Sequence, residues 1–198
     1  MKKTNMAFPK VLIVLIAAGF VFSAGTGINQ LYAVEQIKGA SVESVQKESV
    51  IKGAGPYSNI SIGTISALPE IQEKYKSQVS ELKNSLIQDL RSNKKFTKVL
   101  VGNKASGKTV IVSGKIIKMN IVDLQTRQLH GGFAGKSYID IQLKLTDASN
   151  GKVIKEIVIG TYNNPAGAGW SRGATDQSMP ADMGKIISAY LSTVIPVK

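Results

Sequence analysis

The chain has 198 residues, of which 43% are hydrophobic and 19% are charged, a balance that excludes wholesale disorder and is typical of one globular domain. It contains no cysteine and a single histidine, which excludes disulfides, cysteine-ligated metals, thiolate catalysis and histidine-based triads. Its formal charge of +12 indicates an anionic partner.

The first 33 residues have the pattern of a secretion signal. Three lysines lie within the first ten residues, and an apolar or small-residue run follows at 11–22. We predict cleavage after Ser23 or after Ala33; the alternative is an uncleaved N-terminal anchor, for which the apolar run is short. Loss of the three leader lysines leaves a charge of +9. The protein is therefore expected to be exported by a bacterial cell, and to be periplasmic or associated with the envelope.

The part after the leader is expected to be a linker followed by one domain. Residues 34–57 are polar and without periodicity, which predicts a flexible linker, and residues 58–198 form a single α+β domain. That domain opens with a strand from Asn59 to Ile65. A helix with Pro69 in its first turn follows and ends near Ser92, because apolar residues recur at spacings of three and four. These residues are Ile71, Tyr75, Val79, Leu82, Leu86 and Leu90.

Four strands and a second helix complete the domain. The strands cover 96–101, 109–122, 138–146 and 153–161. A turn with the sequence DASNG joins the last two, and a change of phase in the second predicts a β-bulge near Gly114 and Lys115. The last helix follows Asp176 and has an apolar face from Met179 to Val194. The order β-α-β-β-β-β-α predicts an α+β fold, in which an antiparallel sheet of about five strands has two helices on one face.

One segment matches a nucleotide-binding motif. Gly102–Thr109 reads GNKASGKT, which fits the phosphate-binding pattern GxxxxGK[ST], and a predicted strand precedes it. A helix should follow, with its N-terminus facing the phosphates, but the residues after Thr109 alternate as in a strand. We therefore interpret the segment as the polar loop of a β-hairpin and expect no nucleotide site.

No other pattern indicates catalysis. No two Asp or Glu residues stand in a pattern that would place them across a cleft, as glycoside hydrolysis requires. No serine lies in a GxSxG motif. We expect a protein that is not an enzyme, with no catalytic residue, metal site or cofactor.

Two glycine-rich loops are the candidates for a binding site. They cover 124–136 and 160–175, and the candidate residues in them are Arg127, His130, Phe133, Trp170 and Arg172. Arginine and aromatic side chains beside flexible backbone are typical of protein interfaces. The alternative is that both loops are plain surface connections, with Phe133 and Trp170 folded against the edge of the core.

Three segments resemble a known family of exported bacterial proteins. They read VSGKI from Val112, GGFAGK from Gly131 and LTDASNGKVIKE from Leu145. In this the chain is similar to the domain of unknown function 4410 (DUF4410), which has such a strand, a glycine-rich loop, a turn and a C-terminal helix. The resemblance implies a small envelope domain of the α and β type. Many relatives are lipoproteins, whereas this chain lacks the cysteine that would carry the lipid.

These observations predict a non-enzymatic envelope module for binding or assembly, which recognises another envelope protein through the two loops. The alternative is a module that docks to anionic lipid or cell-wall polymer through its basic surface and so associates with the membrane. Nucleic acid is not an expected partner, because the leader predicts export. High salt should weaken docking through the basic surface much more than recognition through the loops.

Overall fold

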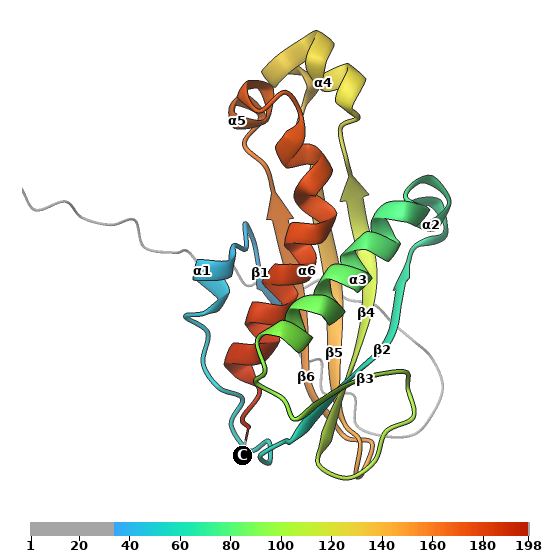
Figure 1. Ribbon diagram of the computed structural model, residues 1–198, viewed down its shortest axis with the longest axis vertical. Coiled ribbons are helices and arrows are strands. Elements are labelled where there is room, and N and C mark those ends of the chain that lie inside the picture. Colours follow the sequence, from blue (N-terminus) through green and yellow to red (C-terminus); the bar gives the residue numbers. More distant parts are fainter. Residues whose placement is uncertain (1–33, 198) are drawn as a thin grey trace, which may run out of the picture.

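The computed structural model describes residues 34–197, which form a six-stranded sheet with helices against one face (Figure 1). The strands are β1 (Glu35–Ile37), β2 (Asn59–Ala67), β3 (Lys98–Val101), β4 (Thr109–Asn120), β5 (Tyr138–Asp147) and β6 (Val153–Tyr162). The helices are α1 (Val42–Val45), α2 (Pro69–Lys74), α3 (Lys76–Ser92), α4 (Leu124–His130), the 3-10 helix η1 (Gly131–Ala134), α5 (Pro165–Trp170) and α6 (Ala174–Val194). The strand order across the sheet is β1-β6-β5-β4-β2-β3. The α+β class is as predicted.

The sheet is mixed, which corrects the predicted antiparallel sheet of about five strands. β4, β5 and β6 are antiparallel neighbours, as expected. β2, however, lies between β3 and β4 and is parallel to both, and β1 is parallel to β6. The cause is a crossover: α2 and α3 carry the chain back along the sheet, so that β3 starts at the same end as β2. Alternating apolar residues predict a strand but not its direction.

The segment 34–57, predicted to be a flexible linker, contributes to the fold. β1 pairs with β6, and the Ala40 N–H donates to the carbonyl of Gly160 at 2.8 Å. α1 begins with a capping box between two serines and buries Val45 completely. The linker prediction was wrong for this part because a three-residue strand, held by backbone hydrogen bonds, leaves no apolar period in the sequence.

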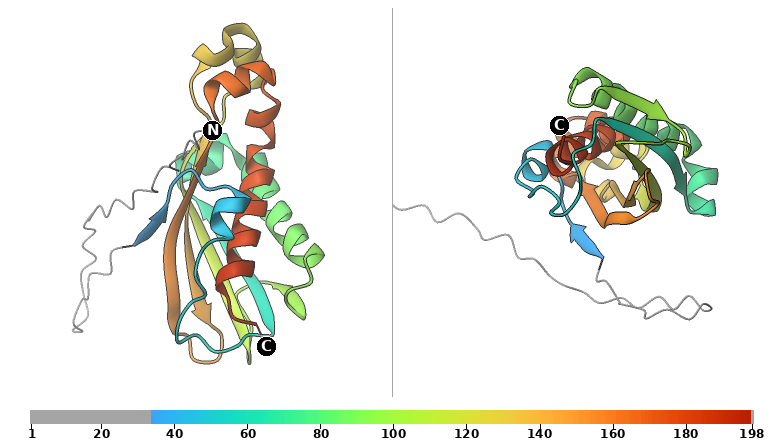
Figure 2. Two further views of the ribbon diagram at one scale, coloured as in Figure 1. Left: turned by 90° about the vertical axis from the view of Figure 1, so that its left-hand side faces the viewer. Right: turned by 90° about the horizontal axis from the view of Figure 1, so that it is seen from below.

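Two long helices cover one face of the sheet, and short helices add to the two that were predicted. Figure 2 shows α3 and α6 together on one side of the strands. The first predicted helix is divided at Tyr75, whose φ of −123° and ψ of 32° separate α2 from α3. The Tyr75 hydroxyl accepts a hydrogen bond from the Ile121 N–H at 3.3 Å, just beyond β4. This contact holds the break in the helix against the sheet.

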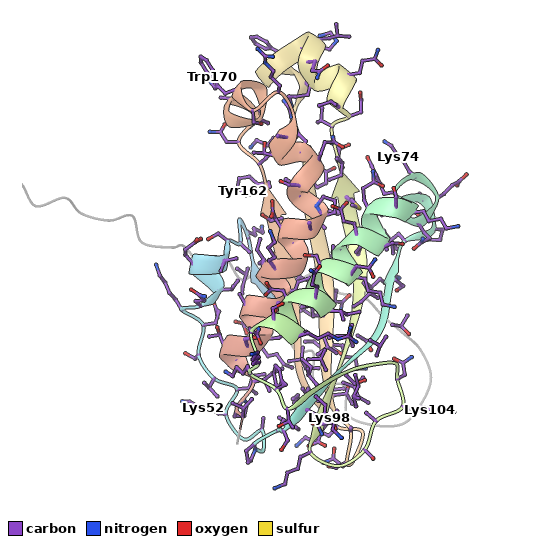
Figure 3. The ribbon with its side chains drawn as sticks, in the orientation of Figure 1. Lys52, Lys74, Lys98, Lys104, Tyr162 and Trp170 are labelled. Atoms are coloured by element: carbon purple, nitrogen blue, oxygen red, sulfur yellow. The ribbon has the colours of Figure 1, made fainter. Side chains whose placement is uncertain are left out.

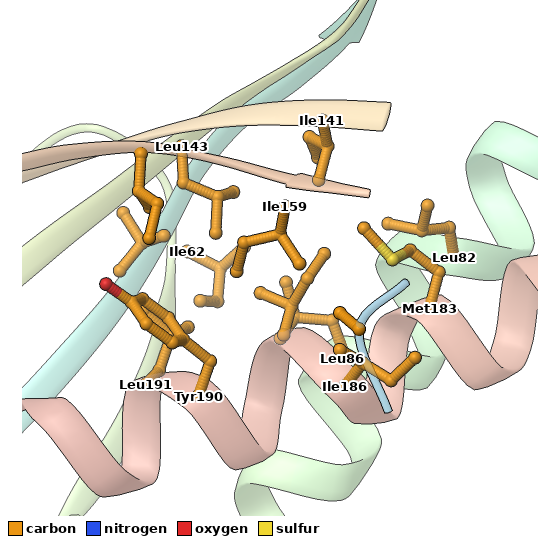
Figure 4. Packing of buried hydrophobic residues seen from close by; sticks show 14 of the residues in the cluster. Ile62, Leu82, Leu86, Ile141, Leu143, Ile159, Met183, Ile186, Tyr190 and Leu191 are labelled. Atoms are coloured by element: carbon orange, nitrogen blue, oxygen red, sulfur yellow. The ribbon is translucent and has the colours of Figure 1, made fainter. Parts of the chain in front are cut away.

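The core lies between the sheet and these two helices (Figure 4). It includes Ile62, Ile141, Leu143 and Ile159 from the sheet, Leu82 and Leu86 from α3, and Met183, Ile186, Tyr190 and Leu191 from α6. The apolar faces predicted for both helices and for β5 are therefore the buried faces. Among the residues that the structure describes, no helix is both long and apolar enough to span a membrane.

The bulge in β4 lies close to its predicted position, just after Lys115. Alternate residues from Val110 to Ile116 stay on the buried face, and the register shifts between Ile116 and Lys118. On the other side of β4, the pairing with β2 also shifts register between Ile62 and Ile65, opposite Val112 and Gly114. Gly114 also serves packing, because a Cβ there would lie 3.0 Å from a side-chain carbon of Ile141. A change of apolar phase in the sequence does not distinguish this packing role of glycine from a bulge.

Candidate functional site

The two predicted loops lie together at one end of the molecule, where they form short helices instead of open loops (Figure 1). We call this end the apical tip and define it as α4, η1 and α5. Its parts pack closely, because a Cβ on Gly169 of α5 would lie 2.8 Å from the backbone nitrogen of Gly132 in η1. The structure therefore brings the two predicted segments into one surface.

A buried ion pair holds the apical tip to the rest of the fold. The Arg127 Nε donates to Asp176 Oδ2 at 2.8 Å, and Arg127 Nη2 donates to Asp176 Oδ1 at 3.1 Å. Both side chains are fully buried. Arg127 comes from α4 and Asp176 from the first turn of α6, so that the pair joins the tip to the longest helix. The bidentate geometry also fixes the orientation of the guanidinium.

The remaining hydrogen-bonding groups of this pair are also satisfied. Arg127 donates to the carbonyls of Gly131 and Gly135 at 2.7 and 2.9 Å, which fixes both ends of η1. Asp176 Oδ1 accepts from the Ser137 hydroxyl at 2.6 Å and from the side-chain amide of Asn163. Such a fully bonded polar cluster is rigid, because any movement that breaks one of its bonds leaves a buried polar or charged group without a partner.

The surface of the apical tip is strongly apolar. The exposed fractions of the side chains are 100% for Phe133, 90% for Trp170 and 74% for Leu129. Trp170 projects away from the sheet and helices in Figure 3. Neither aromatic side chain folds back against the core edge, the alternative that the sequence left open. The tip thus combines a polar, rigid interior with an apolar exterior.

The other candidate residues divide between the surface and the interior. His130 and Arg172 are exposed beside the apolar side chains, and Arg172 has a positive φ of 50°. Arg127 is 1% exposed, which corrects the expectation that it faces a partner. Its contribution is to position the tip. The sequence indicated only that the last helix follows Asp176, and no local pattern connects this residue with an arginine 49 residues earlier.

A shallow groove lies beside the apical tip, between the end of β6, α5 and α6. Its volume is about 340 Å³, and its lining includes Tyr162, Ala168, Met179 and Asp182. Lys136 lies over the Tyr162 ring, 5.4 Å from its centroid. The groove extends the apolar surface of the tip, and Asp182 adds one carboxylate to the lining of the groove.

The segment with the phosphate-binding pattern has a different environment from a nucleotide site. Strand β4 follows it directly, as predicted, and the Thr109 hydroxyl donates to Ser106 O at 2.8 Å within the loop. Its interpretation as a hairpin loop was wrong, since β2 lies between β3 and β4. The loop connects two strands that are both parallel to β2. In residues 34–197 no group of three His, Asp or Glu side chains is arranged to hold a metal ion.

The fold and the tip define a small α+β domain with helices on one sheet face and an apolar surface at one end. The chain belongs to the family described as domain of unknown function (DUF4410), whose model matches residues 34–163. This match confirms the resemblance noted in the sequence. It includes α4 and η1 and ends just before α5. No curated protein matches the chain.

Several solved structures are distantly similar. A PelC dodecamer from Paraburkholderia phytofirmans is 12% identical, with 70% of this chain and 89% of that chain covered and a TM-score of 0.44. A Xanthomonas campestris protein with the family model DUF330 is 11% identical, with 72% and 89% covered and a TM-score of 0.47. A neuraminyllactose-binding hemagglutinin homolog from Helicobacter pylori is 14% identical, with 73% and 84% covered and a TM-score of 0.34. Similarities this distant assign no function.

Proposed function

We propose that this protein is a non-enzymatic binding module of the bacterial cell envelope, and that its apical tip recognises another envelope protein. The observation that carries the proposal is the exposure of Phe133, Trp170 and Leu129 on a rigid base. Side chains this exposed contribute little to the core of their own domain. Large aromatic residues supply much of the binding energy where proteins meet.

The buried cluster supports this proposal because it orders the tip before any partner arrives. Arg127 fixes η1, which carries Phe133. Asn163, which lies just before α5, donates to Asp176 and so fixes the start of the helix that carries Trp170. A surface that is ordered in advance loses little conformational entropy on binding. We therefore expect the partner to bind a preformed surface.

The shape of the tip indicates what the partner offers. Phe133 and Trp170 project as separate apolar side chains from neighbouring helices, and the groove beside α5 is shallow. A partner with an apolar pocket or furrow would bury these side chains, whereas a flat polar surface would not. Recognition would then depend on apolar burial and only weakly on ionic strength.

Cross-linking in living cells tests the proposal. A photo-reactive phenylalanine analogue at position 133 is expected to capture one defined envelope protein. With that protein purified, the double variant Phe133→Ala, Trp170→Ala should bind it about a hundredfold to a thousandfold more weakly, at about 2 kcal/mol for each interface aromatic.

The controls separate binding from folding. The same analogue placed at Gln72, an exposed position of α2 outside the tip, should not capture that protein. The double variant should unfold at the same denaturant concentration as the original chain, because the removed side chains are exposed. Equal affinity of the variant and the original chain for the captured protein would contradict the proposal.

The envelope location is proposed from the pattern of the first 33 residues. The family match begins at residue 34, which agrees with cleavage after Ala33. We expect the protein in the envelope fraction to begin at Val34, as measured by intact mass and N-terminal sequencing. A start at Ala24 would select the other cleavage site, and recovery from the cytoplasm alone would contradict the envelope location.

A further inference from the structure

Lysines gather at the end of the molecule opposite the apical tip. We call this end the basal pole and define it as residues 50–58, 94–109 and 147–152. Backbone hydrogen bonds join its three segments: Ser58 N–H donates to Lys108 O at 2.9 Å, and Ala148 N–H donates to Thr109 O at 3.0 Å. The pole includes the loop between β3 and β4 and the hairpin turn between β5 and β6, which lie together in Figure 1.

The charge of the basal pole is almost entirely positive. Its three segments contain seven lysines and one acidic residue, Asp147. The Asp147 carboxylate already accepts hydrogen bonds from the Ser149 hydroxyl and the Tyr57 hydroxyl, at 2.6 and 3.0 Å. The hydrogen bonds from Ser149, followed by the one from Tyr57, lower the pKa of Asp147. The carboxylate of Asp147 is therefore ionised and already bonded to neighbouring groups of the pole.

Six of the seven lysines face solvent. Lys95 is the exception, because it donates to the carbonyl of Ser192, and its partial burial lowers its pKa. The exposed ones are Lys52, Lys94, Lys98, Lys104, Lys108 and Lys152. Figure 3 shows Lys52, Lys98 and Lys104 spread across this end. None of the six takes part in an ion pair within residues 34–197.

Apolar side chains are interspersed with these lysines. In the edge strand β3, Leu100 is 38% exposed and Val101 is 53% exposed, directly between Lys98 and Lys104 in the chain. A soluble anionic polymer would pair with the lysines and leave these side chains in water. A bilayer surface satisfies both kinds of residue, because it offers phosphates to lysines and an apolar boundary beneath them.

We propose that the basal pole docks on an anionic phospholipid bilayer. The exposed lysines lie at the level of the lipid phosphates, and Leu100 and Val101 enter the interface. Each lysine near such a surface contributes roughly a fivefold increase in partitioning, so that six of them give substantial attraction even without an anchor. Because the two ends are opposite, this docking leaves the apical tip free, and it does not depend on the function proposed for the tip.

Vesicle sedimentation tests the docking. The chain from Val34 onward contains every described element and the core that these elements form, and a cooperative unfolding transition would verify its fold before use. It should bind vesicles of mixed phosphatidylglycerol and phosphatidylcholine at low salt. The variant Lys98→Glu, Lys104→Glu, Lys108→Glu should bind them at least about a hundredfold more weakly, since each reversal removes more than one lysine contribution.

A matched variant controls for total charge. Lys74→Glu, Lys76→Glu, Lys115→Glu makes the same change of net charge at exposed positions outside the basal pole, and it should keep most of the binding. The variant Leu100→Ser, Val101→Ser should also lose binding, by about tenfold, if these side chains enter the interface. Equal losses in the two lysine variants would overturn the assignment to the pole. Binding to soluble polyphosphate but not to vesicles would overturn the assignment to lipid.

Discussion

Replacement of Asp176 by alanine is expected to lower the free energy of unfolding by about 3–5 kcal/mol, because it leaves a buried guanidinium without its counter-charge. Arg127 would retain only its bonds to two carbonyls, and the Ser137 hydroxyl and the Asn163 amide would lose an acceptor. Urea unfolding followed by circular dichroism would measure the change.

Two further variants show whether the buried charge causes this loss. The double variant Arg127→Leu, Asp176→Leu removes both charges and should recover part of the stability, since an apolar pair of similar volume is often tolerated where a single charge is not. Asp182→Ala breaks an exposed ion pair with Lys185 and should cost less than about 1 kcal/mol. A similar small cost for Asp176→Ala would show that the cluster does not hold the tip.

The apical tip illustrates which parts of the site the sequence could predict. Glycine, arginine and aromatic residues concentrated in two segments predicted the surface that we propose as the binding site, because interface composition is a local property. The ion pair that orders this surface is not local. Arg127 and Asp176 meet only once β5, β6 and α5 have placed α6 beside α4, and a charged residue in a polar loop otherwise indicates solvent. For this reason the burial of Arg127 and Asp176 could not be predicted from the sequence.

The sheet shows the same division between local and distant information. The strict alternation in β5 and the helical spacing in α3 predicted both the elements and their buried faces, because burial on one side determines the period. Strand direction follows from the crossover through α2 and α3, and β1 is recruited by backbone bonds to β6. Neither leaves a period in the sequence. The cationic basal pole was only partly hidden: five of its seven lysines lie in residues 94–109, and the fold adds Lys52 and Lys152 from two distant segments.

Close contact between α3 and α6 leads to a second stability prediction. The helices meet at Gly184, where a Cβ would lie 2.7 Å from the Leu82 carbonyl oxygen and 2.8 Å from the Leu86 nitrogen. Both are backbone atoms of α3 and cannot move aside as a side chain could. The Ser85 hydroxyl also donates to Ala181 O across this contact at 2.7 Å. Any side chain at position 184 must therefore push the helices apart.

The variant Gly184→Ala is expected to lower the free energy of unfolding by about 1–3 kcal/mol, because overpacking outweighs the gain of about 1 kcal/mol from replacing a helical glycine. Gly167→Ala, in α5, is the matched control: its Cβ would lie 3.8 Å from the nearest atom, so that only the helical gain remains. Urea unfolding of the two variants should thus shift the midpoint in opposite directions. Equal stabilisation by both would mean that α3 and α6 separate without cost, and that the core does not depend on their closest approach.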